Sequence, residues 1–589
     1  MRLAKRKLSP IQKPIWGWLS FFLLNFILFF PLFIAYYDNT SLFPLDEFLA
    51  REDFRRKITF IYNRYNPDPF RISLDFVAMS LLFFFIGRLR ALKLLWLWFS
   101  FFLMLLIYNV YFHFTFSIYS FIPTLASDYA FIMEGVKVFV KETPIRALLA
   151  ISVIVILCIP IFQLLKFWVL SISDTKKQTP GVGIVFLIAC LIGFSRLYIF
   201  TDAANKRAQF PPVIFCISCE LISNLDRSID FRQSIEDFDI AKKVAQTNLL
   251  KAAVEAAPNI NLIMIESYGS IIYSNSEFFE IINYQDSAYQ NLANQQLNIV
   301  SNLSISPVSG GASWLSYNTL LNGFQINSNE LYKKISVNSE YELLNLFKWL
   351  NYNSYKTYFL APSFPIGSVS FGESLKEYYG SENWILHDDF YHYKGPRLGW
   401  GSAPTDQYSF SYTYDLAQKQ KLTHQPSFTF FLTKDSHNPF ITVGHAIDNW
   451  KDWNYIESSE KTSSYVEKPE AKNYVKSIRY EFDWISRFLM DQASKNDVTI
   501  IIGDHQPPYF NKGADFKTPI HIISSDSLFV NGFKKYGFVD GIIPDTTNAK
   551  SINHAGFYSM LVRELVRAYG DTTERYPKYY PEGFELISE

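Results

Sequence analysis

The sequence predicts a membrane α-helical N-terminal domain joined to an α/β C-terminal domain. Apolar residues crowd into the first third of the 589-residue chain, where five segments are long and apolar enough to cross a bilayer. Beyond residue 258, short β-rich runs alternate with helical stretches, which is typical of helices packed on a mostly parallel sheet. We therefore predict a five-span transmembrane domain at 1–200, a helical linker at 201–258 and an extracytoplasmic domain at 259–589.

The predicted spans match the length of about 20 residues that a helix needs to cross a bilayer. The second is the weakest, because it is short and carries Asp75 near its start. The first lacks a small-residue cleavage site and is too long for a cleavable signal peptide. The spans run roughly from Trp16 to Tyr37, Ile72 to Gly87, Leu92 to Phe116, Ala147 to Ile172 and Gly181 to Phe200.

Basic residues gather before the first span, between the second and third, and between the fourth and fifth. These three loops share one side of the membrane, and the positive-inside rule makes that side the cytoplasm. The loop from Asp38 to Arg71 is also basic, but acids are interleaved with its cations. Five crossings from the inside deliver everything after Phe200 to the outside. We expect a multi-pass protein of the cytoplasmic (inner) membrane whose C-terminal domain is extracytoplasmic.

Charge and cysteine content exclude other classes. The chain carries 55 basic and 55 acidic residues, whereas proteins that bind nucleic acid usually have a basic excess, so we expect no nucleic-acid partner. Four cysteines are too few for a disulfide framework. Cys216 and Cys219 form a single CxxC without the second pair that a structural zinc site needs. An ordinary packed or juxtamembrane pair is favoured over a metal or redox site.

The C-terminal region supplies the elements of an α/β fold. The stretch IEDFDIAKKVAQTNLLKAAVEAA has helical spacing and predicts a connecting helix. Helical patterns follow in SEYELLNLFKWL and VKSIRYEFDWISRFLMDQA. The predicted strands are NLIMIE, YKTYFLA, SFTFFLT, VTIIIG and PIHIIS.

Three of these strands end in polar side chains of the kind that bind metals. Glu266 follows NLIMI, Asp504 and His505 follow TIIIG, and Asp435 and His437 follow SFTFFLTK. Each has an ordinary alternative, as a residue near a helix start or in a turn. Active sites of open α/β sheets gather where the carboxyl ends of strands emerge. A divalent cation needs several such ligands from separate elements, so the three strand ends together favour a metal site.

The stretch SPVSGGASWLSYNTLLNG offers a nucleophile. Gly310 and Gly311 allow close backbone approach, and Ser313 precedes a helical pattern. Free N–H groups at a helix start can receive a phosphate, and a metal-bound hydroxyl loses its proton readily. The alternative is that Ser313 only caps the helix. Ser309 and Ser316 are the rival nucleophiles.

The order of NLIMIES, GGASW, SHNPF and IIIGDH resembles the sulfatase-like branch of the alkaline phosphatase superfamily. Within it the chain looks like membrane enzymes of the lipoteichoic acid synthase type and their phosphoglycerol and phosphoethanolamine transferase relatives. The resemblance implies a five-span membrane domain and an α/β, sulfatase-like catalytic domain. It also implies transfer of a phospholipid headgroup phosphate, through a covalent serine intermediate, to an envelope glycan or glycolipid.

The resemblance also assigns roles to individual residues. Glu266, Ser313, Asp504 and His505 would bind one divalent ion, with Ser313 as the nucleophile in a place where threonine is common. Oxygen-rich ligation with one histidine suits Mn or Mg, and Zn is the ion that the phosphoethanolamine branch implies. The absence of cysteine beyond Cys219 favours the lipoteichoic type.

Substrate contacts follow the family pattern less closely. His437 in SHNPF matches a substrate-binding or proton-donating histidine. The Trp and Arg that grip glycerol phosphate in lipoteichoic acid synthases have no counterpart in APSFPIGSVSFGES. Arg397 and Asp406 are candidate replacements for this pair; the alternative is that both are ordinary surface-loop residues. The sequence around Ser313 lacks the x-Pro-x-Arg of sulfatases, which disfavours sulfate esters. The alternative functions are an exported phosphodiesterase or sulfatase-like hydrolase, and a non-catalytic membrane scaffold that retains the fold.

Overall fold

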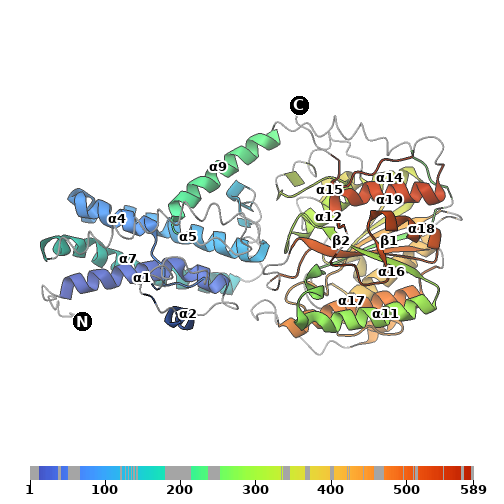
Figure 1. Ribbon diagram of the computed structural model, residues 1–589, viewed down its shortest axis with the longest axis horizontal. Coiled ribbons are helices and arrows are strands. Elements are labelled where there is room, and N and C mark those ends of the chain that lie inside the picture. The colour runs from blue at the N-terminus through green and yellow to red at the C-terminus, as the bar shows by residue number, and fades with distance from the viewer. Residues whose placement is uncertain are drawn as a thin grey trace. The chain divides into compact units, whose positions relative to one another are not determined.

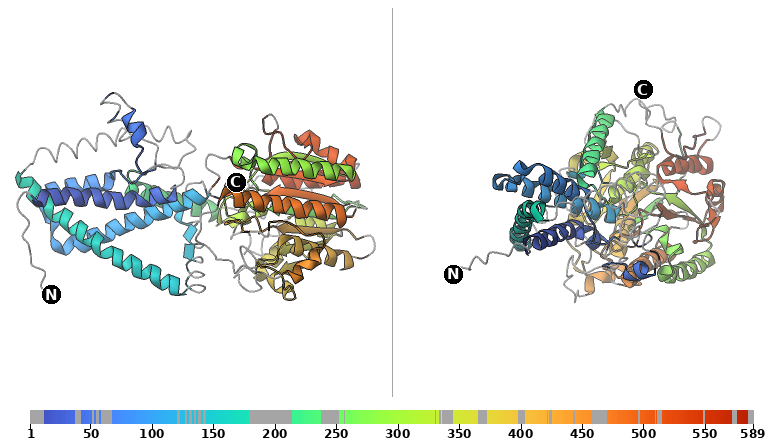
Figure 2. Two further views of the ribbon diagram at one scale, coloured as in Figure 1. Left: turned by 90° about the horizontal axis from the view of Figure 1, so that it is seen from below. Right: turned by 60° about the vertical axis from the view of Figure 1, so that its left-hand side comes forward.

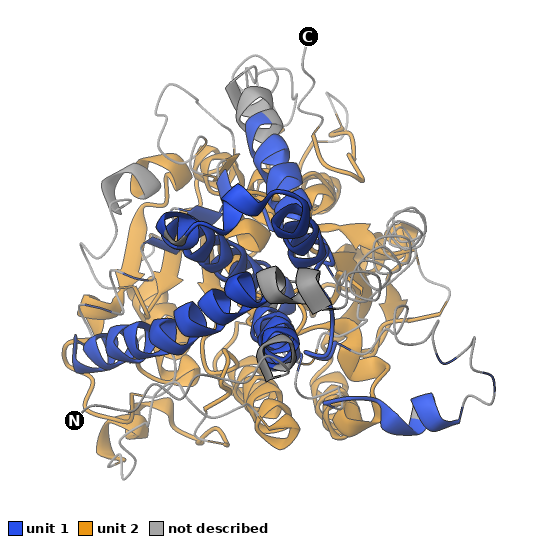
Figure 3. Ribbon diagram, turned by 90° about the vertical axis from the view of Figure 1, so that its left-hand side faces the viewer, with its two compact units in different colours: residues 1–233 blue, residues 234–589 orange. Residues whose placement is uncertain are grey.

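The computed structural model of the chain divides into two compact units, Met1–Gln233 and Ser234–Glu589 (Figure 3). Apart from short gaps and a few single residues, the described residues are 12–36, 42–50, 67–119, 144–178, 214–236, 252–329, 345–364, 372–397, 403–441, 444–456, 470–508 and 515–584.

The described part of unit 1 is helical. Three of its helices are long and apolar enough to cross a membrane, over Trp16–Ala35, Leu95–Ser117 and Pro144–Ser171. They belong to α1, α5 and α7; α1 packs against both of the others (Figure 2). The helices are α1 (Gln12–Ala35), α2 (Leu45–Leu49), α4 (Leu74–Phe85), α5 (Leu95–Tyr119), α7 (Pro144–Gln178) and α9 (Ile217–Glu236), the last ending just beyond the unit boundary.

Five spans are therefore not confirmed. The first, third and fourth predicted spans lie in helices of sufficient length. The second coincides with α4, which is apolar but has only 12 residues. The fifth, and most of the predicted connecting helix, lie outside the described residues.

Asp75 has a structural role at the start of α4. Ser73 caps this helix, and its hydroxyl donates to Asp75 Oδ2 over 3.0 Å. The same carboxylate accepts the backbone N–H groups of Ile217 and Ser218 at 2.8 and 3.3 Å, which satisfies the first turn of α9. Cys216 and Cys219 in this turn form a disulfide.

Unit 2 contains a mixed β-sheet, in the order β4-β3-β5-β1-β6-β7-β2-β8, with β9 beside β2. The strands from β4 to β6 run parallel, whereas β7 is antiparallel to both β6 and β2. The strands are β1 (Ile260–Ile265), β2 (Asn298–Ile305), β3 (Lys356–Ala361), β4 (Asn383–Leu386), β5 (Ser427–Leu432), β6 (Val498–Gly503), β7 (Lys517–Ser524), β8 (Val539–Asp540) and β9 (Ile552–Asn553).

Helices cover both faces of this sheet, as an α/β sandwich requires. Figure 1 shows α12, α14 and α19 on one side and α11 and α17 on the other. On the second side, Trp484 and Phe488 of α17 and Phe410 of α16 pack with Phe431 of β5 in the main core. The helices are α11 (Phe279–Asn294), α12 (Ser313–Asn322), α14 (Leu346–Tyr352), α15 (Gly372–Tyr379), α16 (Asp406–Gln420), α17 (Ala471–Asp491), α18 (Ser527–Asn531) and α19 (His554–Tyr569).

The predicted α/β class is confirmed for unit 2, and each of the five predicted strands is a strand. Sequence analysis missed β2, β4, β8 and β9. The strand β2, NIVSNLSI, mixes apolar and polar residues, yet all of its interior is buried. It lies between β7 and β8, where Ser301, Asn302 and Ser304 find hydrogen-bond partners inside the protein.

Candidate functional site

Glu266 and Asp504 meet because their strands are neighbours in register. Ile265, the last residue of β1, pairs with Gly503, the last residue of β6. The next residue of each parallel strand therefore leaves the sheet at the same edge. Both side chains are buried, with exposed fractions of 3% and 0%.

The end of β6 needs glycine. A side chain at Gly503 would collide with the carbonyl oxygen of Tyr268. The close approach lets Asp504 N–H donate to the Ile265 carbonyl over 3.2 Å. Asp504 Oδ1 in turn accepts the N–H groups of Ser267 and His505 at 2.7 and 2.6 Å, which leaves Oδ2 facing the other ligand-type residues.

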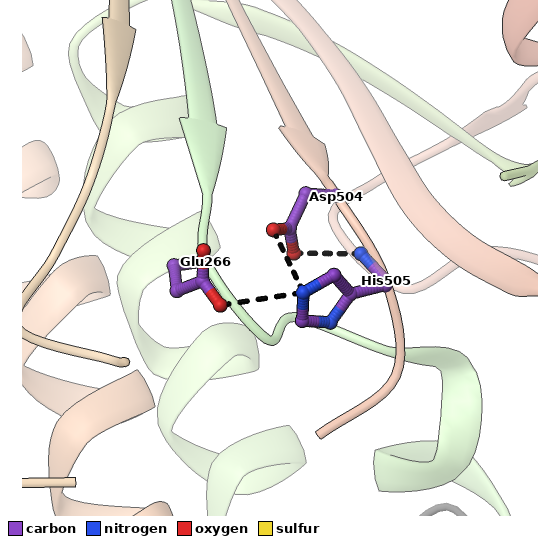
Figure 4. A group of neighbouring side chains, drawn as sticks. All are labelled: Glu266, Asp504 and His505. Atoms are coloured by element: carbon purple, nitrogen blue, oxygen red, sulfur yellow. Dashed lines mark hydrogen bonds and ion pairs between the residues drawn. The ribbon is translucent and has the colours of Figure 1, made fainter. Parts of the chain in front are cut away.

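His505 is fixed through both ring nitrogens. Its Nδ1 lies 2.8 Å from the Gln506 carbonyl oxygen, so Nδ1 carries the proton and donates it there. Its Nε2 lies 3.3 Å from Glu266 Oε1 and 3.2 Å from Asp504 Oδ2 (Figure 4). In the neutral tautomer, the Nε2 lone pair therefore faces the two carboxylates.

Ser313 is the first residue of α12. Gly311 and Ala312 before it both have positive φ, at 68° and 59°, which turns the chain sharply into the helix. The Ser313 hydroxyl donates to Glu266 Oε2 over 2.8 Å and lies 3.2 Å from His505 Nε2. Its side chain is half-buried, so the hydroxyl lies at the border of the cluster.

The two rival serines are placed differently. Ser316, one turn into α12, donates its hydroxyl to the Asp504 carbonyl over 2.7 Å and so ties the helix to the end of β6. Ser309 Oγ is buried and has no hydrogen-bond partner among the described residues. Of the three candidate nucleophiles, Ser313 is the one whose hydroxyl meets the carboxylate of Glu266.

The buried charges of this cluster shift one another's protonation. Burial opposes the charged form of Glu266, but the charges of His505 and His437 outweigh it and hold the pKa of Glu266 below its usual value. Burial and the nearby Glu266 carboxylate raise the pKa of Asp504 well above its usual value. Burial favours neutral His505, but Asp504 and Glu266 raise its pKa to about 9. Such opposed shifts among neighbours are typical of functional sites.

The donor set fits a divalent cation. Ligand atoms of Glu266, Asp504 and His505 lie within 4.8 Å of one another. Asp504 Oδ2 is buried and receives no hydrogen bond from the described residues, so its lone pairs are available to a cation in the cluster. Two buried carboxylates repel each other unless a cation lies between them. Ser313 Oγ adds a fourth oxygen or nitrogen donor beside them.

His437 lies in the turn that follows β5. Its backbone N–H donates to the Lys434 carbonyl over 2.9 Å, and its Nδ1 lies 2.6 Å from the Asn438 carbonyl oxygen. The half-buried ring is close enough for its charge to lower the pKa of Glu266. The chain therefore brings a second histidine near Glu266 from a different strand.

Arg397 and Asp406, the two candidate substrate contacts, form their hydrogen bonds with residues other than the four proposed ligands. Arg397 is half-buried, donates to the Phe390 carbonyl over 2.8 Å and lies over the Tyr393 ring. Asp406 is fully buried at the start of α16, and its Oδ2 accepts backbone N–H groups of Lys434 and Asp435. The Asp406 side chain thus faces the protein interior, not a surface loop.

Sequence analysis missed two residues that support the cluster. The Thr433 hydroxyl accepts the Glu266 N–H over 3.0 Å. Gln506 accepts the Ile271 N–H and donates to the Lys517 carbonyl, which locks the segment after His505. Thr433 is the last residue of the predicted strand SFTFFLT, and Gln506 lies three residues after the predicted strand VTIIIG. Their positions at strand ends were a signal, but neutral polar side chains are not typical metal ligands.

Comparison with known proteins gives matches to solved structures alone. No family model matches the sequence, and no curated protein does. The lipoteichoic acid synthase LtaP from Listeria monocytogenes is 14% identical, with 59% of this chain and 81% of that chain covered and a TM-score of 0.36. A protein of the alkaline phosphatase superfamily from Vibrio parahaemolyticus is 13% identical, with 53% and 68% covered and a TM-score of 0.33.

A third match is the soluble domain of lipooligosaccharide phosphoethanolamine transferase A from Neisseria meningitidis. It is 10% identical, with 53% of this chain and 88% of that chain covered and a TM-score of 0.34. The names of these proteins agree with the family that the motifs resemble. Because the identities and TM-scores are so low, we transfer no activity, metal or substrate from them to this chain.

Proposed function

We propose that the chain is a metal-dependent phosphotransferase that moves a phospholipid headgroup phosphate onto an envelope glycan or glycolipid through a covalent intermediate on Ser313. The observation that carries this proposal is the placement of the Ser313 hydroxyl. It heads a helix and contacts both Glu266 and His505, which are two members of a buried group suited to a cation. A hydroxyl with these neighbours is suited to attack phosphorus.

Glu266, Asp504, His505 and Ser313 would hold one divalent ion. Three oxygen donors and one imidazole favour Mn or Mg, and Zn also accepts such ligands. When bound, the ion would lower the pKa of the serine hydroxyl and neutralise charge on the phosphate. The Nδ1–H bond from His505 to the Gln506 carbonyl would keep the ring oriented for this task.

In the first step, Ser313 Oγ forms a bond to phosphorus and the bond from phosphorus to the diacylglycerol oxygen breaks. The serine proton leaves along the hydrogen bond to Glu266 Oε2. The departing diacylglycerol oxygen takes a proton from His437, the histidine near Glu266. Backbone N–H groups at the start of α12 would donate hydrogen bonds to the phosphate oxygens.

In the second step, an acceptor hydroxyl on a glycan or glycolipid attacks the same phosphorus. The bond to Ser313 Oγ breaks, the acceptor's proton returns to His437, and the serine regains its proton from Glu266. The apolar helices α1, α5 and α7 suggest insertion in a membrane, which would keep the protein beside its lipid donor. We propose that residues 259–589 form the extracytoplasmic catalytic domain.

The test compares Ser313→Ala with Ser309→Ala in the full-length protein, with labelled phosphatidylglycerol and phosphatidylethanolamine and added Mn²⁺. Ser309 lies in the same segment and its hydroxyl has no hydrogen-bond partner in the described part of the chain, so its loss controls for a local change. We expect Ser313→Ala to lower diacylglycerol release at least about a thousandfold, with Ser309→Ala close to wild type. Equal release by wild type and Ser313→Ala would remove the serine from the mechanism.

Product analysis separates the proposed transferase from a hydrolase. With candidate sugars present, we expect the labelled headgroup phosphate on the sugar. Free headgroup phosphate, unchanged by any acceptor, would instead indicate a phosphodiesterase that uses water. A wild-type protein that binds no metal and releases no diacylglycerol would support the scaffold alternative.

A further inference from the structure

Four charged side chains lie buried together behind the turn that carries His437. Lys434 and Asp435 belong to this turn, Asp406 begins α16, and Glu481 lies in α17. Their exposed fractions are at most 3%. Buried charges are stable only when hydrogen bonds or ion pairs compensate for the lost water, so the partners of each charged group show how the cluster is stabilised.

The side chains of Asp406 and Asp435 each accept the backbone N–H group of the other residue. Asp406 Oδ2 accepts the N–H groups of Lys434 and Asp435 at 2.8 and 2.7 Å. In return, Asp435 Oδ2 accepts the Asp406 N–H over 2.8 Å, and Asp435 Oδ1 pairs with the Lys434 ammonium. The start of α16 is thereby joined to the turn after β5.

That turn touches the proposed site at both of its ends. At its start, Thr433 N–H donates to the Met264 carbonyl over 3.0 Å, and the Thr433 hydroxyl accepts the N–H of Glu266. At its end, His437 N–H donates to the carbonyl of Lys434. Any shift of the turn would therefore move Glu266 and His437 together.

One contact in the cluster requires a proton. Asp406 Oδ1 and Glu481 Oε1 are buried oxygens that receive no hydrogen bond from any N–H or hydroxyl of the described residues. The two residues lie where α16 meets α17, since the neighbouring Gln407 N–H donates to the Tyr480 hydroxyl over 3.3 Å. A side-chain hydrogen bond with Asp406 is also among the causes of the raised pKa of Glu481. Two carboxylates can share a hydrogen bond only if one of them is protonated.

We propose that Glu481 keeps its proton and donates it to Asp406, and that Asp406, held in this way, acts as a positioning residue that fixes the turn supporting Glu266 and His437. The role in positioning rests on the function proposed above, whereas the shared proton does not.

The hydrogen-bond inventory decides which acid carries the proton. Asp406 receives two N–H groups on one oxygen, which stabilises its charged form. Glu481 receives one, from Trp484 Nε1 at 2.7 Å. The groups facing Glu481 are Asp406, Asp435, Lys434 and Tyr480, and the sum of their charges is negative. Burial and the charges of Asp406 and Asp435 accordingly raise the pKa of Glu481 well above its usual value.

An infrared difference spectrum tests the shared proton. In the full-length protein at pH 7, wild type minus Glu481→Gln should show the band of one protonated carboxylic acid. The same substitution at Glu564, which is also buried but pairs with Arg567 and Lys535, should give no such band. A wild type minus Glu481→Gln spectrum without the acid band would overturn the proposal.

Metal affinity tests the positioning role, because a residue important only for folding would alter stability and leave affinity intact. Glutamine at 481 can donate to Asp406 Oδ1 and accept from Trp484, whereas alanine can do neither. We therefore expect Glu481→Gln to bind Mn²⁺ within about twofold of wild type. Asp406→Ala and Glu481→Ala should bind it at least about tenfold more weakly, as with other residues that orient metal ligands.

The outcomes are distinguishable from failure of the proposed function. If the wild type binds no Mn²⁺, the proposed metal centre fails, while the infrared comparison still decides where the proton lies. If the wild type binds Mn²⁺ and the folded Asp406→Ala protein, checked by circular dichroism, binds it equally well, Asp406 does not position the site and the inference is wrong.

Discussion

The Ser313 hydroxyl donates a hydrogen bond of 2.8 Å to Glu266, although the two residues are 47 positions apart, one at the start of a helix and the other just after a strand. The contact depends on two local features. The positive φ values of Gly311 and Ala312 turn the chain so that Ser313 begins the helix. The Thr433 hydroxyl holds the Glu266 backbone where β1 ends. Both features position a serine hydroxyl next to a buried carboxylate, and this arrangement has consequences that can be measured.

Replacing Glu266 with glutamine should weaken Mn²⁺ binding by at least about tenfold. Glutamine keeps the shape of the side chain but removes the charge that faces His505 Nε2, and a hard divalent ion prefers carboxylate oxygen. Titration calorimetry of the full-length protein measures the change. Glu280→Gln is the matched control, because Glu280 is an exposed acid that pairs with Arg479. Equal affinities for wild type and Glu266→Gln would exclude Glu266 as a ligand.

Gly503→Ala adds one methyl group, yet it should weaken Mn²⁺ binding at the site. The added methyl group would meet the Tyr268 carbonyl oxygen, so the end of β6 must move and carry Asp504 and His505 with it. We expect Mn²⁺ affinity to fall at least about tenfold and the unfolding midpoint to drop. Gly541→Ala is the control for the effect of backbone conformation alone. Its added methyl group would meet open space, but its φ of 100° disfavours alanine, so we expect a loss of about 1 kcal/mol of stability. Wild-type metal affinity in Gly503→Ala would contradict this account.

The sequence was most informative where strands were apolar and their ends were polar. All five predicted strands form, and the structure brings Glu266, Asp504 and His505 together because β1 and β6 are parallel neighbours. The register and the order of the strands cannot be read from periodicity. The strand β2 was missed because its buried Ser301, Asn302 and Ser304 look like surface residues, and their partners His521, Tyr536 and His554 lie more than 200 positions away.

The position of Asp406 shows a second limit. A carboxylate in a Gly-rich and Pro-rich stretch was interpreted as a substrate contact or a loop residue. Its partners are backbone N–H groups of Lys434 and Asp435, and backbone donors have no signature in a sequence. The role of Asp75 in the short α4 helix was similarly ambiguous from the sequence. In the structure its carboxylate accepts the N–H groups of Ile217 and Ser218, and these donors have no signature in the sequence either.

Unit 2 should be accessible from outside the cell membrane. In a Cys158→Ser, Cys190→Ser background, which leaves only the disulfide-bonded Cys216 and Cys219, Tyr391→Cys should react with a membrane-impermeant maleimide in intact cells, since Tyr391 is 87% exposed. Lys93→Cys, in the exposed basic segment between α4 and α5, should react after lysis but not before. This follows from the positive-inside rule. Labelling of Lys93→Cys but not Tyr391→Cys in intact cells would reverse the proposed orientation.

Mild acid should destabilise the protein through two buried histidines. His521 contacts Ser301 and Tyr268 at 2.7 and 2.9 Å, and burial lowers its pKa to about 3; burial does the same for His554. In the unfolded chain a histidine takes up a proton below about pH 6.5, whereas the folded protein holds these two neutral. Stability is therefore present above pH 6.5 and is lost as pH falls toward 3. Between pH 7 and pH 5 the loss is about 2 kcal/mol for each histidine.

Chemical denaturation at pH 7 and pH 5 measures this difference. His521→Gln should show a pH-dependent loss about 2 kcal/mol smaller than that of wild type, whatever its stability at pH 7. His445 is exposed, so His445→Gln should retain the full wild-type loss. If His521→Gln loses as much stability as wild type between the two pH values, His521 takes up a proton in the folded protein as readily as in the unfolded chain. Its contacts with Ser301 and Tyr268 would then not keep it neutral.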